Sequence, residues 1–489
     1  MDRRHFLTSV AAILPATAFA APPTTAFRPI LRDVANIRRM AASSARLLDP
    51  ALANITGFAL FDTEIGKVLD SYQPDLQLPP ASVTKALTAV YARSILGPEY
   101  RFVTKLVATG PVVNGIVQGD VYLVGGGDPA LDTDELAELA AAAVTAGVKG
   151  VRGRFFVDGS ALPNSNEIDR TQPLYLGYNP SVSGLNLNFN RVYFEWKQAA
   201  AGYDLTLDAR GVHNRPLVRW IDIKSEDRGA PVFAYANQDG HDHWSVARSA
   251  LGKGGGRWLP VRQPADYVGE VFRTLAAKSG LSLPVHKHGS VPTQGIEVAR
   301  FESNEMDEVL RWMLKYSNNL TAECIGLMAS KTLGRSAQNL QSSAASMGLW
   351  AKANLGVGGA NLRNHSGLSD KSRISAAQMA GILRHSKSRQ ALDGLLKPFN
   401  VFDRNGKALA LEGVKVSAKT GTLNFARGLA GYLEKGGRKY SFAIFAADMP
   451  RRENIPMAER ERPRGAKSWS GQAKHQEQVL LRHWLDILP

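Results

Sequence analysis

A serine and a lysine three residues apart, at the start of an apolar helix, constrain this chain more than any other feature. The motif Ser82-x-x-Lys85 opens an alanine-rich run over residues 82–96, and Gly97-Pro98 ends that run. Because residues i and i+3 share one face of a helix, the two side chains can meet. Ser82 is therefore a candidate nucleophile and Lys85 a candidate base. A serine N-cap followed by a solvated lysine would give the same residues, so the motif needs support from elsewhere in the chain.

Two further polar motifs provide that support. Ser317-Asn318-Asn319 lies in a predicted turn between an amphipathic helix and an apolar helix over residues 320–333. Lys419-Thr420-Gly421 follows a predicted strand over residues 414–418. Ser-x-x-Lys, Ser-x-Asn and Lys-Thr-Gly, in this order, are the signature set of penicillin-binding proteins and serine β-lactamases. The chain resembles these enzymes in its motifs and in their contexts of helix start, interhelix turn and strand end.

The chemistry of acyl transfer gives the first two motifs their roles. The reaction needs a nucleophile, a base for its proton, a route for that proton to the leaving amine, and donors for the oxyanion. Ser82 would attack and Lys85 would take its proton. Ser317, bridging between lysines, would pass the proton to the departing nitrogen, and Asn319 would hold the substrate amide and the lysine in register.

The third motif would bind the substrate. Lys419 and Thr420 offer a charge and a hydroxyl group to a substrate carboxylate, and Gly421 lets the substrate backbone approach the strand edge. The backbone N–H groups of Ser82 and Thr422 would form the oxyanion hole. None of these roles needs a histidine, a metal or an organic cofactor.

The spacing of the motifs indicates an insertion. From Lys85 to Ser317 is 232 residues, far more than the helical segment that most enzymes with these motifs place there. Residues 99–262 contain β-like runs such as 121–124, a predicted helix over 133–146, and many turns rich in Gly, Asn and Asp. We therefore expect a β-rich region inside the catalytic domain.

This pattern resembles the D-alanyl-D-alanine carboxypeptidase/endopeptidase family of class C low-molecular-mass penicillin-binding proteins. The resemblance rests on five segments: GDVYLVGGGDPAL at 119–131, FFVDGSALP at 155–163, YNPSVSGLNLNFN at 178–190, NHSGLSDKSRIS at 364–375 and SAKTGTLNFARGLAGYL at 417–433. It implies an α/β fold of the penicillin-binding-protein and serine β-lactamase type, an antiparallel sheet with helices, split by two small β-rich domains. The expected division is a signal peptide over 1–20, catalytic parts over 21–98 and 263–489, and the insert over 99–262.

Two positions depart from that family. Asn318 stands where the second motif usually has aspartate, and Asn364-His365 replaces a segment that usually carries an acidic residue. The following Ser366-Gly367 is expected to line the cleft as a loop. Asn318 carries neither of the roles assigned to its motif, and the departure at Asn364-His365 bears on substrate preference rather than on acylation.

The N-terminus indicates where the protein works. A basic head with Arg3-Arg4, an apolar run over residues 6–14, and the small residues Ala18 and Ala20 match a secretory signal peptide. Arg3-Arg4 also resembles a twin-arginine signal, and an ordinary Sec signal is the alternative. We expect a periplasmic protein with no transmembrane segment after removal of the signal.

Composition adds two limits. The single cysteine, Cys324, cannot form an internal disulfide, so stability must come from an apolar core. The formal net charge of +15 either suits an anionic cell envelope or reflects a solvated surface. No basic run is long enough to mark a nucleic-acid tail, so no nucleic-acid partner is expected.

We therefore predict a serine DD-peptidase that acts on peptidoglycan stem peptides through an acyl-enzyme on Ser82. It would cleave D-Ala-D-Ala termini and D-Ala to diamino-acid crosslinks, and β-lactam antibiotics would inhibit it covalently. One alternative is a β-lactamase or esterase of the same fold. Another is a catalytically weak envelope scaffold whose inserted domains bind a partner. Glu323 and Glu412 are explained by local structure, unlike the deacylating glutamate of class A β-lactamases.

Overall fold

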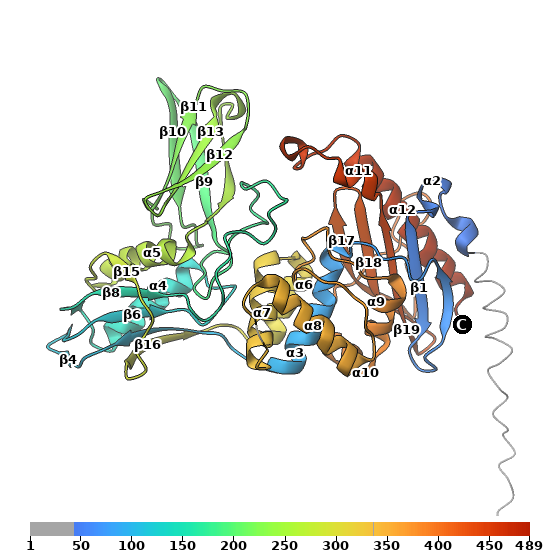
Figure 1. Ribbon diagram of the computed structural model, residues 1–489, viewed down its shortest axis with the longest axis horizontal. Coiled ribbons are helices and arrows are strands. Elements are labelled where there is room, and N and C mark those ends of the chain that lie inside the picture. The colour runs from blue at the N-terminus through green and yellow to red at the C-terminus, as the bar shows by residue number, and fades with distance from the viewer. Residues whose placement is uncertain (1–43, 336) are drawn as a thin grey trace, which may run out of the picture.

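The computed structural model describes residues 44–489 with the exception of residue 336. The predicted signal peptide over residues 1–20 lies outside this described part. Figure 1 shows an elongated molecule, with a domain built on a large sheet at the right and a β-rich region at the left. We call the first the split domain, residues 44–102 and 303–489, and the second the insert, residues 103–302.

The split domain is built on a five-stranded antiparallel sheet in the order β17-β18-β19-β1-β2. The strand predicted over residues 414–418 continues through the third motif to Leu423. The five strands are β1 (Thr56–Asp62), β2 (Val68–Tyr72), β17 (Val414–Leu423), β18 (Ala426–Lys435) and β19 (Arg438–Ala447).

Both faces of this sheet are covered, because every residue of β1 is buried. Successive side chains of a strand point to opposite faces. Phe58 and Leu60 accordingly join a cluster with Trp484 of α12, the long C-terminal helix. Ala59 and Phe61 join a second cluster formed with the helices of the other face. The prediction that the final helix packs on the sheet is confirmed.

The helices on the second face surround α3, which carries the first motif. Its residues from Thr84 to Ala92 are all buried, which explains why the sequence is apolar all round rather than amphipathic. Gly97 ends it with a φ of 90° that suits glycine. The helices of the split domain are α2 (Pro50–Ala53), α3 (Thr84–Leu96), α6 (Met306–Tyr316), α7 (Asn319–Thr332), α8 (Leu340–Leu355), α9 (Ala376–Arg384), α10 (Ser386–Leu392), α11 (Met449–Glu453) and α12 (Ala466–Ile487).

The insert has two units, as Figure 1 shows. The lower unit is a five-stranded sheet, β15-β8-β6-β3-β16, packed against α4 and α5. The upper unit contains two three-stranded sheets, β10-β9-β14 and β11-β13-β12. One apolar cluster, with Phe155, Phe194, Trp244 and Phe272 among its members, joins the two units.

The elements of the insert are β3 (Val103–Ala108), β4 (Val112–Val113), β5 (Ile116–Val117), β6 (Val121–Val124), α4 (Thr133–Thr145), β7 (Gly150–Val151), β8 (Phe155–Asp158), β9 (Arg191–Ala199), β10 (Gly202–Asp208), β11 (Ile221–Glu226), β12 (Phe233–Gln238), β13 (His241–Ala247), β14 (Gly254–Pro260), α5 (Pro264–Ser279), β15 (His286–His288) and β16 (Ile296–Glu302). The short strands β4, β5 and β7 form a small sheet of their own.

The insert extends beyond the boundary expected at residue 262. Strand β15 pairs with β8, and β16 pairs with β3. These two strands were expected in the second catalytic part, but their hydrogen bonds lie in the sheet of the insert. We therefore place the end of the insert near residue 302, because a sheet strand belongs to the core that its neighbours form.

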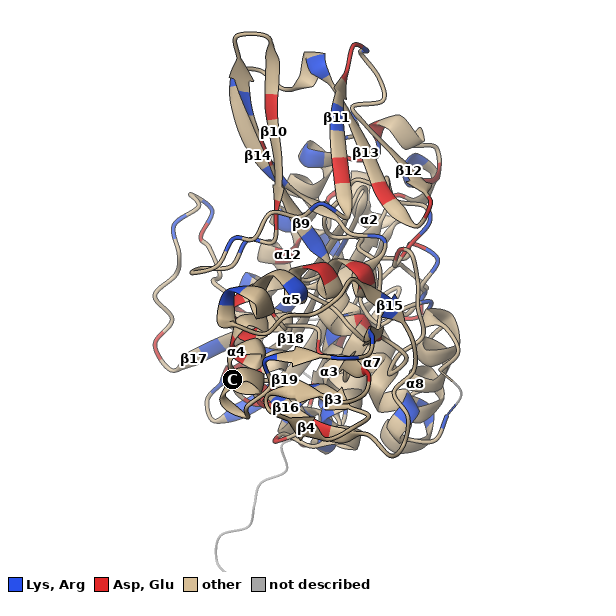
Figure 2. Ribbon diagram, turned by 90° about the vertical axis from the view of Figure 1, so that its left-hand side faces the viewer, with Lys and Arg blue, Asp and Glu red and all other residues tan. Residues whose placement is uncertain are grey.

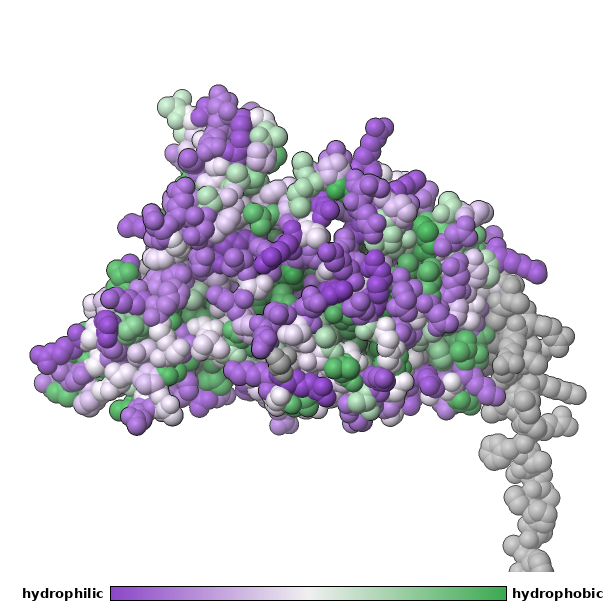
Figure 3. Space-filling view, in the orientation of Figure 1, coloured by the Kyte–Doolittle hydropathy of each residue, from purple (hydrophilic) through white to green (hydrophobic). Residues whose placement is uncertain are grey.

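The surface carries charges of both signs. Figure 2 shows Lys and Arg interspersed with Asp and Glu along the face that it presents, and Figure 3 shows scattered apolar side chains on a mainly hydrophilic face. Within the described residues, no helix combines the length and apolar character that crossing a membrane requires.

Candidate active site

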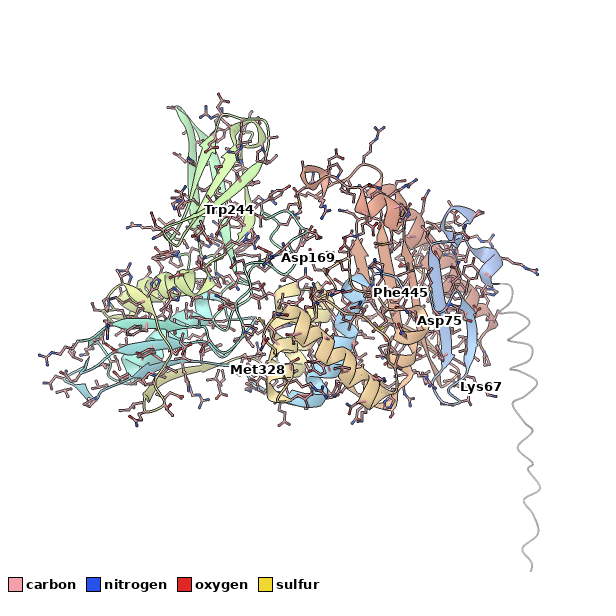
Figure 4. The ribbon with its side chains drawn as sticks, in the orientation of Figure 1. Lys67, Asp75, Asp169, Trp244, Met328 and Phe445 are labelled. Carbon is pink, nitrogen blue, oxygen red and sulfur yellow. The ribbon has the colours of Figure 1, made fainter. Side chains whose placement is uncertain are left out.

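A pocket of about 290 Å³ lies where the three motifs meet. Six parts of the chain line it: the short helix before α3, the turn between α6 and α7, the end of β17, the loop before α9, the insert, and the region after β19. In Figure 4, Asp169 marks the insert loop that reaches toward the split domain above α7, where Met328 is labelled. The lining residues are Ser82, Gln172, Tyr178, Ser317, Asn319, Gly367, Leu368, Thr422, Leu423, Asn424, Arg452 and Glu461.

Ser82 lies in a single 3-10 turn, η2 (Ala81–Val83), directly before α3. The sequence placed it in the first α-helical turn, so the helix begins slightly later than predicted. Its hydroxyl group caps neither helix, and Ala81 before it has a φ of 47°, in the left-handed region that non-glycine residues rarely adopt. A simple N-cap role for Ser82 is therefore excluded.

Lys85 is completely buried beneath Ser82. Its Nζ lies 3.0 Å from Ser82 Oγ and donates to Asn319 Oδ1 at 2.7 Å and to the Ser366 carbonyl oxygen at 2.8 Å. Burial holds the pKa of Lys85 well below its usual value, and the positive charge of Lys419 lowers it further. A lysine whose pKa is lowered in this way is a better candidate for a general base than an exposed lysine.

Asn319 connects the insert to Lys85. Its Oδ1 accepts from Lys85, and its Nδ2 donates to the Tyr178 carbonyl oxygen of the insert at 2.8 Å. Because one end of the amide is held by each partner, its orientation is fixed. The insert therefore contributes a backbone atom to the order of the site.

Ser317 ends α6 in the left-handed conformation, with a φ of 60°. Lys419 Nζ donates to Ser317 Oγ at 3.0 Å and to the Thr420 carbonyl oxygen at 2.9 Å. Burial, assisted by the charge of Lys397, lowers the pKa of Lys419 to about 7. The expected bridge between both lysines is present only in part, since among the described residues no hydrogen bond joins Ser317 to Lys85.

The end of β17 lies directly against η2. A Cβ atom at Gly421 would come within 2.7 Å of the Pro80 carbonyl oxygen and 2.9 Å of the Ser82 nitrogen. Position 421 therefore needs glycine because the chain packs on itself there. Thr422 lines the pocket, and its Oγ1 accepts from Arg427 Nη1 at 3.3 Å.

The structure brings all three motifs together, with the lysines beneath the pocket and the serines, Asn319 and Thr422 on its wall. Of the predicted Ser366-Gly367 pair, Gly367 lines the pocket, together with Leu368, whereas Ser366 is fully buried. The side chain of His365 is also fully buried, and it is bonded to Ser343.

Several residues near the motifs were not predicted as site residues, among them Tyr178, Glu323, Arg452 and Glu461. Glu323 accepts the N–H groups of the loop beside Lys85. Arg452 pairs with Asp370 at 3.2 Å, and Glu461 lies 3.7 Å from Arg257 of the insert. No local pattern marks these residues, because long-range packing alone brings them to the site.

Throughout residues 44–489, position 336 apart, no three His, Cys, Asp or Glu side chains gather as a metal site would require.

Comparison of sequences supports the family resemblance. Residues 40–463 match the family described as D-Ala-D-Ala carboxypeptidase 3 (S13). A D-alanyl-D-alanine carboxypeptidase from Actinomadura sp. is 28% identical over 438 residues, which cover 82% of this chain and 79% of the relative. D-alanyl-D-alanine carboxypeptidase DacB from Haemophilus influenzae is 23% identical over 417 residues, covering 80% of this chain and 84% of that protein.

Solved structures show the same fold. Penicillin binding protein 4 from Haemophilus influenzae superposes with a TM-score of 0.71 at 19% identity, covering 90% of this chain and 99% of its own. That protein complexed with a novel β-lactam gives a TM-score of 0.65 at 19% identity, covering 85% and 92%. The predicted penicillin-binding-protein fold is thus confirmed.

Proposed function

Because the chain belongs to the D-Ala-D-Ala carboxypeptidase 3 (S13) family and is a serine carboxypeptidase, we propose that Ser82 attacks the peptide bond between two D-alanine residues of a peptidoglycan stem peptide. The observation that carries this proposal is the contact between Ser82 and the buried Lys85. The matches to named D-alanyl-D-alanine carboxypeptidases support the choice of substrate.

The surroundings of Lys85 explain how it serves as the base. Two of its three neighbours, Asn319 Oδ1 and the Ser366 carbonyl oxygen, can only accept hydrogen bonds. A neutral amine has two N–H groups and one lone pair. Both N–H groups are therefore used by the two acceptors, and the lone pair is left to face the Ser82 hydroxyl group, whose proton it can take.

The reaction then proceeds in two steps. Ser82 Oγ forms a bond to the carbonyl carbon, the carbon–nitrogen bond breaks, and the proton taken by Lys85 passes to the leaving nitrogen. We assign the relay of this proton to Ser317, which contacts Lys419 in the structure and must approach Lys85 during the reaction. Water later hydrolyses the ester. The N–H groups of Ser82 and Thr422 stabilise the oxyanion, and protonated Lys419 binds the substrate carboxylate together with Thr420.

The same step accounts for cleavage of crosslinks. A D-Ala to diamino-acid bond also releases an amine nitrogen, so its cleavage needs no additional group in the site. We include this endopeptidase activity in the proposal. The complex of the Haemophilus influenzae protein with a β-lactam supports acylation of Ser82 by β-lactams here as well.

The proposal includes export of the protein, because peptidoglycan lies outside the cytoplasm. The signal-like residues 1–20 support a periplasmic location. Fractionation of cells that produce the full chain tests this, and retention in the cytoplasm would contradict it.

Covalent labelling tests the nucleophile. We expect Ser82→Ala to abolish labelling by a fluorescent penicillin and the release of D-alanine from muropeptides, with an unchanged circular dichroism spectrum. Ser94→Ala, an exposed serine of the same helix, is the matched control and should label normally. Labelling of Ser82→Ala at full stoichiometry would overturn the assignment, and a purely binding scaffold would release no D-alanine in either form.

A further inference from the structure

Glu323 is a buried carboxylate to which the mechanism above gives no role. It lies one turn after Asn319 on α7 and is 0% exposed. Its Oε2 accepts the N–H group of His365 at 2.9 Å, and its Oε1 accepts that of Ser366 at 2.8 Å. Burial raises the pKa of Glu323, although these N–H groups and the charge of Lys85 act in the opposite direction.

The Ser366 residue links Glu323 to the catalytic lysine. Its N–H group donates to Glu323, while its carbonyl oxygen accepts from Lys85 Nζ at 2.8 Å. The neighbouring His365 carbonyl oxygen accepts from Thr88 Oγ1 of α3 at 2.7 Å. The loop is therefore held between α7 and α3, with one of its carbonyl oxygens aimed at Lys85.

Glu323 and Lys85 also interact through their charges. The charged groups that face Lys85 are Glu323 from α7 and Lys419 from β17. The loop presents a neutral His365, since burial lowers the pKa of that imidazole to about 3. Glu323 raises the pKa of Lys85 and Lys419 lowers it, so the two groups oppose each other.

We propose that Glu323 is a positioning residue for acylation. It clamps the N–H groups of His365 and Ser366, so that the Ser366 carbonyl oxygen holds Lys85 Nζ against Ser82, and its negative charge offsets that of Lys419. This inference rests on the proposed function, in which Lys85 is the base.

Replacement of Glu323 by glutamine tests the positioning role separately from an effect on the stability of the fold. In Glu323→Gln, the amide nitrogen faces one of the two N–H donors, so that donor loses its acceptor in a buried site. We expect the acylation rate to fall about tenfold or more. Because the carboxylate that raises the pKa of Lys85 is gone, the acid limb of the pH–rate profile should move to lower pH.

A matched control exists in the insert. Glu270 is also buried, and its carboxylate accepts the N–H groups of the consecutive residues Arg219 and Trp220 at 2.9 to 3.1 Å. Glu270→Gln should lower the thermal midpoint while leaving the acylation rate and its pH profile unchanged. If both variants lose thermal stability but only Glu323→Gln changes the pH profile of acylation, Glu323 has a positioning role.

The experiment measures acylation by a fluorescent penicillin across pH, with Ser82→Ala as reference. If Ser82→Ala still labels, the proposed function fails. If it does not label but Glu323→Gln matches the natural enzyme, only this inference fails. Should the glutamine variant not fold, Glu323→Asp decides, because it keeps the charge and shortens the reach: a slower rate at an unshifted acid limb supports the proposal, and a natural rate overturns it.

Discussion

Single side chains in this site owe their chemistry to burial. Lys85 and Lys419 are both buried, and both have lowered pKa values. Their partners differ, however. Lys85 faces Ser82 and two obligatory acceptors, whereas Lys419 contacts Ser317 at the side of the pocket. The first arrangement suits a base, and the second leaves a charge available for a ligand.

A carboxylate-binding role for Lys419 predicts a difference between ligands. Lys419→Ala should slow acylation by carboxylate-bearing ligands more than by neutral esters, by a factor that corresponds to roughly 1.5 to 3 kcal/mol. In the natural enzyme the pKa of Lys419 is about 7, so its charge is present below that pH and lost above it. The preference for carboxylates, measured as a ratio of kcat/KM values, should therefore decline as the pH rises through about 7. Equal losses for both ligand classes would contradict this role.

At the scale of elements, the site depends on how closely β17 approaches η2. Gly421→Ala would place a Cβ atom 2.9 Å from the Ser82 nitrogen, a proposed oxyanion donor. The two elements must then move apart, and we expect about a tenfold or greater loss in acylation rate in a folded protein. Gly471→Ala is the control, because that glycine lies in α12 with no atom within 4 Å of its added Cβ. It should label normally and melt no earlier.

Local elements could be predicted from the sequence, and contacts between distant segments could not. The β-like run at residues 121–124 identified β6, and the three motifs predicted which residues would meet. The pairing of β16 with β3 could not be predicted, because its hydrogen bonds join residues far apart in the chain. For the same reason the sequence explains Glu323 only as a residue of its helix. The N–H groups that it accepts belong to a loop 42 and 43 residues later in the chain.

At the scale of the whole molecule, the pocket is shared between the split domain and the insert. The insert supplies Gln172 and Tyr178 to its wall, and the Tyr178 carbonyl oxygen orients Asn319. The loop after α11 reaches back to the insert, where Arg460 donates to the Thr171 carbonyl oxygen and Glu461 lies near Arg257. The walls of the pocket are therefore formed by the split domain and the insert together.

The same arrangement bears on how the acyl-enzyme is released. A deacylating glutamate of the class A β-lactamase kind must be free to take a proton from water. Glu323 is buried and occupied by two N–H groups, and Glu412 is exposed on the loop before β17. Glu461 lines the pocket, but its carboxylate is paired with Arg257 of the insert at 3.7 Å. None of the three has the surroundings of a dedicated deacylating base.

We therefore predict that a penicilloyl adduct on Ser82 survives for minutes or longer, while D-Ala-D-Ala peptides are turned over. A bulky penicilloyl group remains in the pocket and blocks the approach of water, whereas the natural acyl group leaves room for it. Intact-protein mass spectrometry after a penicillin pulse measures the adduct directly, and Ser82→Ala should show none. Recovery of free enzyme within seconds, with a stoichiometric excess of hydrolysed drug, would mean that the chain is a β-lactamase of this fold instead.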